Sequence, residues 1–224
     1  MDDCTFWYTN EYYPEGSSTF NWRTRIGSFK FSTCGAPVQL LSVVSRKVHG
    51  ALGNKDILLP PPPFSSTNPR GVECRTPGQT GTSGVDYKVV FTFVKNILSC
   101  GTAGTVGGAV VPGPAANQCT ENLTGVPNAQ YTTVTLNGVS DVAGGAGPVS
   151  AIMGVLIGDV NGSGLVNSTD TSQTQAQSGQ PVTGDLGTGN YRKDVNANGL
   201  INSTDTSAVQ AKSGTGLSPL PSAP

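Results

Sequence analysis

A stretch of 21 residues occurs twice near the carboxyl end of the chain. Residues 159–179 and 194–214 align without a gap, and 15 of their 21 positions are identical. Both copies place Asp and Asn at regular intervals, although only 12% of the residues in the chain are charged. One such stretch in a chain rich in Gly and Asn is easily a coincidence, but two in tandem indicate that each copy folds around the same ligand.

The spacing within each copy places oxygen-bearing side chains where a loop can wrap around a cation. Counted from the first Asp of each copy, they stand at positions 1, 3, 5, 9 and 12. Position 6 is Gly, where the chain needs a sharp turn, and position 7 is Leu, whose carbonyl adds an oxygen. This is the spacing of an EF-hand loop, which supplies the roughly six to eight oxygens that Ca²⁺ takes. The candidate ligands are Asp159, Asn161, Ser163, Leu165, Asn167 and Asp170 in the first copy, and Asp194, Asn196, Asn198, Leu200, Asn202 and Asp205 in the second.

The two copies together predict two Ca²⁺ sites. The two Asp of each loop balance the charge of one Ca²⁺, while Asn and Ser add neutral oxygens. Position 8 is apolar, Val166 or Ile201, and we expect these residues to pair the two loops. The alternative is a pair of Asx-turn loops that need no metal.

Residues 158–215 resemble a type I dockerin, the calcium-dependent module with which bacterial proteins dock onto cohesin domains. Dockerins share this double loop, with Asp at position 12 and usually at position 5, so Ser163 implies that the first site is the weaker one. A short helix follows each dockerin loop, and the helices expected here are polar. Because such helices bury little, we expect metal binding to supply much of the folding free energy of this module. The resemblance also implies partner-contacting residues, namely Ser168, Thr169, Ser203 and Thr204.

The middle of the chain reads as a run of strands separated by Gly, Pro and Asn. Val89, Phe91 and Phe93 fall on one face of their segment, as alternation in a strand requires. Short strands at this spacing favour a β-sandwich, and residues 89–97 and 131–145 resemble bacterial Ig-like domains of the surface-layer type. The Pro-rich segment 60–64 and residues 101–118 are interpreted as loops. The strands are expected at 37–48, 55–60, 71–76, 86–98, 129–140 and 148–157.

The first 35 residues are unusually aromatic. Two segments flank a turn at residues 14–18, and apolar and basic residues alternate over 22–26, which predicts a β-hairpin. The piece loosely resembles part of a β-propeller blade. Its aromatic side chains either pack against a sheet or bind sugars. They are Phe6, Trp7, Tyr8, Tyr12, Tyr13, Phe20, Trp22, Phe29 and Phe31.

The chain contains five cysteines and no Cys-x-x-Cys pair. We expect two short-range disulfides, Cys4–Cys34 and Cys100–Cys119, with Cys74 left over, and therefore an oxidising compartment. The alternative is five buried free thiols in a reducing compartment.

No constellation of residues points to catalysis. His49 is the only histidine and is interpreted as a strand-end or loop residue, and the carboxylates outside the repeat are scattered beside turns. A net charge of −1 argues against nucleic-acid binding. No apolar run approaches the roughly 18 residues that span a bilayer. The amino terminus lacks the features of a signal peptide, so for a secreted protein we expect Met1 to begin a piece of a longer chain.

The predicted fold is mainly β, with an aromatic β-hairpin over 1–35, an Ig-like β-sandwich over 36–156, a small α dockerin-like double EF-hand tail over 157–217 and an end segment over 218–224. We expect a non-catalytic calcium-binding tethering protein, the C-terminal part of a larger secreted bacterial protein, located outside the cell or on its surface. Its expected partner is a cohesin-like domain. A second possibility is a subunit of an extracellular filament or surface layer, a homopolymer whose copies join by strand addition. A third is a carbohydrate-binding accessory module, which rests on the aromatic residues alone.

Overall fold

The computed structural model describes residues 5–15, 22–30, 36–60, 71–78, 83–105 and 107–218. Most of its regular elements are strands, so the mainly β fold class is confirmed. The expected disulfide between Cys4 and Cys34 lies outside the described residues, as does nearly all of the Pro-rich segment.

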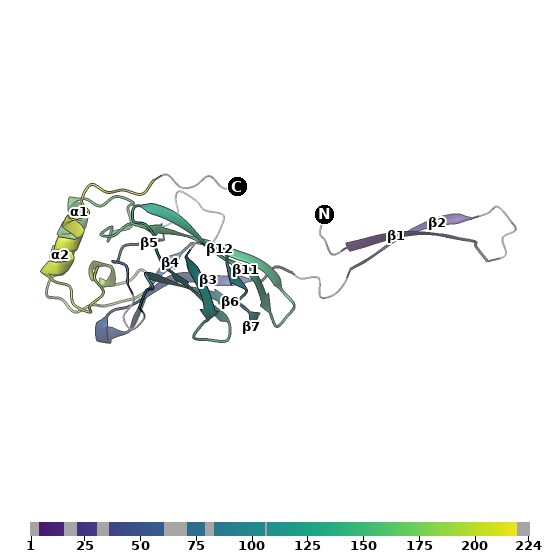
Figure 1. The fold of residues 1–224 in the computed structure, drawn as a ribbon, viewed down its shortest axis with the longest axis horizontal. Helices are drawn as coiled ribbons and strands as arrows, with labels where there is room; N and C mark the ends of the chain where they lie inside the picture. Colours follow the sequence, from purple (N-terminus) through teal and green to yellow (C-terminus); the bar gives the residue numbers. More distant parts are fainter. Residues whose placement is uncertain are drawn as a thin grey trace.

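Two five-stranded sheets form the body of the molecule (Figure 1). The first has the order β4-β3-β6-β10-β9 and is antiparallel throughout. Its strands are β3 (Leu40–Val48), β4 (Asn54–Leu59), β6 (Tyr87–Phe93), β9 (Gly108–Pro112) and β10 (Gln118–Leu123). The second has the order β5-β12-β11-β7, with β8 also paired to β11. Its strands are β5 (Val72–Glu73), β7 (Ile97–Ser99), β8 (Thr102–Ala103), β11 (Gln130–Asp141) and β12 (Ala146–Val155).

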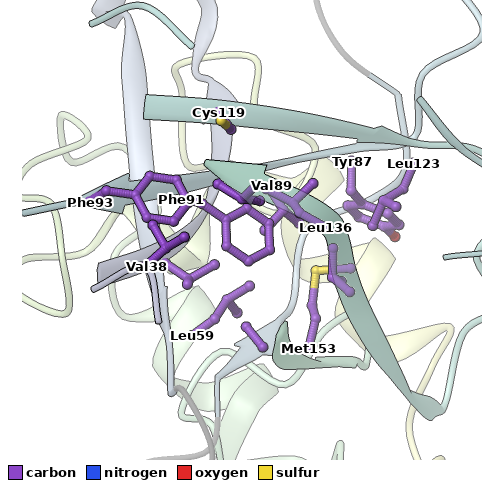
Figure 2. Packing of buried hydrophobic residues seen from close by; sticks show 14 of the residues in the cluster. Val38, Leu59, Tyr87, Val89, Phe91, Phe93, Cys119, Leu123, Leu136 and Met153 are labelled. Carbon is purple, nitrogen blue, oxygen red and sulfur yellow. The ribbon is translucent and has the colours of Figure 1, made fainter. Parts of the chain in front are cut away.

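The main hydrophobic core lies between these sheets (Figure 2). Val89, Phe91 and Phe93 of β6 are fully buried in it, as their alternation predicts. Leu136 of β11 and Met153 of β12 meet them from the second sheet. Two sheets that share one core have the layered arrangement of a β-sandwich.

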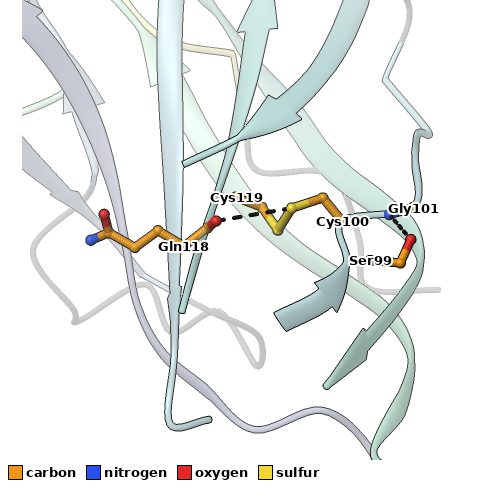
Figure 3. Close-up of a disulfide and its surroundings, with 5 residues drawn as sticks. All are labelled: Ser99, Cys100, Gly101, Gln118 and Cys119. Carbon is orange, nitrogen blue, oxygen red and sulfur yellow. Dashed lines mark hydrogen bonds between the residues drawn. A yellow bond between two sulfur atoms is a disulfide. The ribbon is translucent and has the colours of Figure 1, made fainter. Parts of the chain in front are cut away.

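The segment closed by Cys100 and Cys119 differs from its prediction as a plain loop. It contains β8 and β9 and leads directly into β10. Its runs of Gly and Pro hide the alternation that would have marked these strands. The disulfide itself is present, with the two Cα atoms 5.6 Å apart (Figure 3). It links the end of β7 to β10 and so joins the two sheets.

The expected aromatic hairpin forms a two-stranded sheet of its own. Strands β1 (Thr5–Tyr12) and β2 (Arg23–Lys30) pair antiparallel, and Figure 1 shows them apart from the two larger sheets. The ring of Tyr8 covers Gly27, where a Cβ atom would come within 2.7 Å of it. Trp7 is 71% exposed and Trp22 is 54% exposed, so these rings do not fill a core.

The carboxyl-terminal part is built from two short helices and the loops that precede them. Helices α1 (Ser168–Gln175) and α2 (Ser203–Gln210) lie against each other, and η2 (Tyr191–Lys193) stands between them in the chain. Another short 3-10 turn, η1 (Gly50–Leu52), follows β3. Two further buried clusters join this part to the sandwich. One combines Val72, Leu156 and Ile157 with Val160, Val166, Val195 and Val209, and the other combines Ile57 and Cys74 with Val182, Tyr191 and Ile201.

Candidate metal centre

The first loop of the repeat curls around its own carboxylates. Asp159 accepts hydrogen bonds from the backbone N–H groups of Ser163 (2.9 Å) and Gly164 (2.7 Å). Asp170 accepts from those of Asn161 (3.3 Å) and Asn167 (3.0 Å). Gly164 has a φ of 83°, which favours glycine and provides the expected sharp turn.

The second loop repeats this geometry. Asp194 accepts from the N–H groups of Asn198 (3.1 Å) and Gly199 (2.8 Å), and Asp205 accepts from those of Asn196 (3.1 Å) and Asn202 (3.0 Å). Gly199 has a φ of 93°. Each of the four distances lies within about 0.2 Å of its counterpart in the first loop, which is well inside the spread of ordinary hydrogen bonds. The sequence repeat is therefore also a structural repeat.

The four aspartate side chains carry negative charge into buried positions. Asp159, Asp170, Asp194 and Asp205 are all fully buried. Burial raises the pKa of Asp159, and the charge of Asp170 raises it further. Burial likewise raises the pKa of Asp205, with a smaller contribution from Asp194. Each loop thus holds two buried carboxylates that repel each other, which is unfavourable unless a cation lies between them.

The neighbouring Arg192 binds the backbone of the first loop, and its charge offsets only part of the rise in the pKa of Asp159. Arg192 donates to the backbone carbonyl oxygens of Asp159, Val160 and Val72, at 2.9, 2.9 and 3.0 Å. Among the described residues, one basic side chain contacts a carboxylate of the repeat, namely His49, which lies beside Asp194. The donor set of each loop, two carboxylates with amide, hydroxyl and carbonyl oxygens, suits a hard cation such as Ca²⁺.

The remaining predicted ligands lie in the same loops. The side-chain oxygens of Asn161 and Asn196 accept from the N–H groups at position 5, at 2.8 and 3.0 Å. Asn167 and Asn202, at position 9, are the N-caps of α1 and α2 and accept from backbone N–H groups at 2.7 Å. These Asx-type bonds are equally compatible with the alternative of loops that need no metal. In the part of the chain that the structure describes, no three His, Cys, Asp or Glu side chains are grouped so that they could hold a metal ion. Each loop instead combines two Asp with neutral oxygen ligands.

Position 5 differs between the loops. The hydroxyl of Ser163 donates to the carbonyl oxygen of Leu165 at 3.0 Å, and that carbonyl is itself a predicted ligand. In the second loop, the side chain of Asn198 accepts from the N–H group of Leu200 at 2.8 Å. Among the described residues, it donates no hydrogen bond to the carbonyl oxygen of Leu200. The side chains of both leucines point to solvent, being 45% and 62% exposed.

The expected pairing of the two loops through position 8 is wrong. Val166 exchanges hydrogen bonds with the segment after α2, accepting from Gly214 (2.8 Å) and donating to Thr215 (2.9 Å). Ile201 accepts from Gly179, which follows α1, at 2.8 Å. Each loop is therefore tied to the end of the other copy's helix. The sequence carries the apolar residue at position 8 but no sign of which segment it meets.

The four residues predicted to contact a partner are exposed at the amino-terminal ends of the helices. Ser168 and Thr169 begin α1, and Ser203 and Thr204 begin α2. Thr204 is also bound within its loop, because its hydroxyl donates to Asn202 and accepts from the amide of Asn196, both at 2.8 Å.

The sandwich contributes residues to the second loop that the sequence did not reveal. The Nδ1 atom of His49, just after β3, lies 2.8 Å from a carboxylate oxygen of Asp194. Gly50 donates its N–H to Ala197 (3.1 Å), and Thr76 donates to Val195 (2.8 Å). His49 is a loop residue at a strand end, as predicted, but 145 residues separate it from its partner. Only the folded chain brings them together.

A buried ion pair lies next to the contact between His49 and Asp194. Arg75 and Glu73 are fully buried, and their closest charged atoms are 2.6 Å apart. Burial alone would raise the pKa of Glu73, but the charge and hydrogen bonds of Arg75 outweigh it and lower that pKa to about 2. The pair is therefore ionised at neutral pH.

Comparison of the chain with models of protein families, with curated proteins and with solved structures gives no match. None of the helices in the described residues has the length and apolar character needed to cross a bilayer.

Proposed function

We propose that this chain is a non-catalytic, calcium-binding tethering protein whose two loops each hold one Ca²⁺. The observation that carries the proposal is the pair of buried, mutually repelling aspartates in each of two matched loops. A divalent cation removes that repulsion and uses the oxygens that the loops already gather. The metal would then stabilise a module whose helices bury few apolar side chains.

The double loop with its two short helices supports a dockerin-like module, and two sheets around one core support an Ig-like sandwich. The exposed residues Ser168, Thr169, Ser203 and Thr204 are the proposed contacts to a cohesin-like partner. The Cys100–Cys119 disulfide favours an extracellular or cell-surface location, since such bonds persist in oxidising compartments.

Thermal unfolding with and without Ca²⁺ tests the metal claim. At a Ca²⁺ concentration about a hundredfold above the dissociation constant, each site stabilises the fold by about 2.7 kcal/mol. Because a chelator empties both sites, we expect it to lower the unfolding midpoint by about 10–20 °C. Magnesium in place of calcium is the matched control, because Mg²⁺ demands a smaller octahedral site. An unfolding midpoint that is the same in Ca²⁺ and in chelator would contradict the proposal.

The exposed hairpin supports a second function, assembly of copies of the chain by strand addition. Both β1 and β2 have one partner in their two-stranded sheet, so each leaves an outer edge for another strand. Consecutive residues such as Trp7 and Tyr8 point to opposite faces, and both are at least half exposed. The pairing register places Tyr8, Tyr12 and Phe29 on one face and Trp7 on the other, so the rings do not decide between carbohydrate binding and strand addition. The outer backbone edges of the two strands are what supports strand addition. Size-exclusion chromatography and negative-stain microscopy at high protein concentration should show polymers, and a monomer throughout would rule this function out.

A further inference from the structure

We propose that His49 of the sandwich positions the second calcium loop, so that the second site depends on this residue and the first does not. This inference rests on the proposed calcium binding. His49 follows β3, is fully buried and contacts Asp194, the first residue of the second loop. It is thus a positioning residue contributed by the sandwich, because it acts on a predicted ligand and not on the metal.

The hydrogen bonds of His49 fix which nitrogen carries the proton. Its Nε2 atom lies 3.1 Å from Nη1 of Arg75, and a guanidinium group only donates hydrogen bonds. Nε2 must therefore accept, which leaves the proton on Nδ1. The Nδ1–H group then donates to Oδ2 of Asp194.

Arg75 cannot turn away from this contact, because all five of its N–H groups are engaged. Nε and one Nη2 hydrogen go to Glu73, at 2.7 and 2.6 Å. Nη1 donates to the carbonyl oxygen of Lys55 (2.8 Å) as well as to His49, and Nη2 also donates to that of Ser45 (3.1 Å). The hydroxyl of Ser45 in turn donates to Glu73. Ser45, Glu73, Arg75 and His49 are all buried, so a fixed chain of polar groups runs from β3 and β5 to the loop.

This chain of groups sets the orientation of the Asp194 carboxylate. Oδ2 accepts from His49 and from the N–H group of Gly199, which occupies both of its lone-pair directions. Oδ1 accepts from Asn198 alone and keeps a lone pair for a cation. In the first loop, Oδ2 of Asp159 accepts from the N–H of Gly164 and from no side chain among the described residues. The Asp159 and Asp194 carboxylates accept matching backbone bonds within their own loops, and the donor from the sandwich is particular to Asp194.

The backbone of the second loop is also seated on the sandwich. Gly50 donates its N–H to Ala197, and a Cβ atom at Gly50 would lie 2.2 Å from the carbonyl oxygen of Asn198. Gly53, three residues further on, has a similar positive φ, and a Cβ atom there would meet nothing within 4 Å. Alanine substitutions at these two glycines therefore separate the effect of the contact with the second loop from the effect of backbone strain.

Calcium titration of the full chain, with one site removed at a time, tests this inference. The second site is measured in an Asp159→Asn background and the first in an Asp194→Asn background. His49→Gln keeps an acceptor for Arg75 and withdraws the donor from Asp194, whereas His49→Asn keeps a donor near the Nδ1 position. We expect His49→Gln to weaken the second site about 10- to 100-fold, the usual cost of losing such a supporting group, and to leave the first within about twofold. His49→Asn should restore most of the affinity.

A second pair of variants keeps the test decisive if the His49 variants do not fold. Gly50→Ala should weaken the second site in the same selective way, while Gly53→Ala should leave both sites unchanged. Equal effects on both sites, or no effect on either, would overturn the positioning role and leave calcium binding intact. A parent chain that binds no Ca²⁺ would overturn the proposed function first.

Discussion

Single residues decide how strongly each loop should bind. In the first loop, the hydroxyl of Ser163 donates to the carbonyl oxygen of Leu165. In the second loop, the side chain of Asn198 instead accepts from the N–H group of Leu200. The identity of position 5 was visible in the sequence and predicted a weaker first site. The contact with the carbonyl was not, because it depends on the side-chain rotamer inside the closed loop.

Exchanging these two residues should exchange the ranking of the sites. We expect Ser163→Asn to raise the affinity of the first site and Asn198→Ser to lower that of the second, each by about three- to tenfold, since ligand oxygens tune calcium affinity in such loops. Isothermal titration calorimetry measures both. An unchanged first site in Ser163→Asn would show that position 5 does not set the difference.

Glu121 is a buried acid that the repeat does not explain. It lies in β10 at the edge of the main core, and neither of its carboxylate oxygens meets hydrogen-bond geometry with any described residue. Burial raises its pKa from 4.5 to about 7, although Thr105 nearby offsets part of the rise. Because the folded-state pKa exceeds that of the unfolded chain, this acid costs stability as the pH rises through that window.

Glu121→Gln should remove that pH dependence. Urea unfolding in saturating Ca²⁺ is expected to show the parent losing stability between about pH 4.5 and pH 7 and levelling off above it. At pH 8 the variant should be more stable by about 1–2 kcal/mol. The exposed Glu11 supplies the control, since Glu11→Gln should change nothing. Parallel curves for the parent and Glu121→Gln across this range would refute the assignment.

At the scale of elements, α1 and α2 owe little to their own sequences. Each has eight residues, and isolated helices shorter than about 12–15 residues are marginal in water. Asn167 and Asn202 cap them in full capping boxes with Asp170 and Asp205, which are also predicted metal ligands. The same side chains thus start the helices and close the loops, so metal binding and helix formation should be coupled.

Chelation should therefore unfold the helices before the sheets. In an NMR spectrum of the full chain, we expect amide signals from residues 159–217 to lose their dispersion when Ca²⁺ is removed. Signals from the core strands β6 and β11 should remain dispersed. Helix signals that survive chelation unchanged would mean that the loops fold without metal, as the Asx-turn alternative holds.

Elements were predictable from the sequence where their signal is local. The alternation in residues 89–93 gave a strand whose inward face is the one observed, and the helices after each loop follow from the repeat. Strands β8 and β9 were missed because Gly and Pro obscure their period. The backbone bonds of Val166 to the segment after α2, and of Ile201 to the segment after α1, were missed. They join segments tens of residues apart, and no local pattern indicates such a partner.

In the whole molecule, the repeat and the sandwich pack as neighbours through three kinds of contact. Apolar clusters, the buried chain ending at His49, and the backbone bonds from Gly50 and Thr76 all cross between them. The sequence predicted the two parts but not their joint surface, since contacts such as His49 with Asp194 and Cys74 with Arg192 link residues more than 100 positions apart. The described hairpin residues belong to none of the three buried clusters.

Removal of residues 1–35 should therefore leave the rest of the fold intact. We expect the unfolding midpoint of the shortened chain to lie within about 2 °C of that of the full chain, because a loss of 1 kcal/mol would shift it by about 2–4 °C. Differential scanning calorimetry makes the comparison. A drop of about 5 °C or more would show that the hairpin supports the sandwich, although its described residues belong to none of the three buried clusters.

Two-site calcium binding predicts how many ions each of four matched chains binds. Titration calorimetry should give two ions for the parent, one each for Asp159→Asn and Asp194→Asn, and none for the double variant. Each substitution removes one of the two buried carboxylates that define its loop. A parent that binds no Ca²⁺, or four chains that bind the same number, would contradict the account.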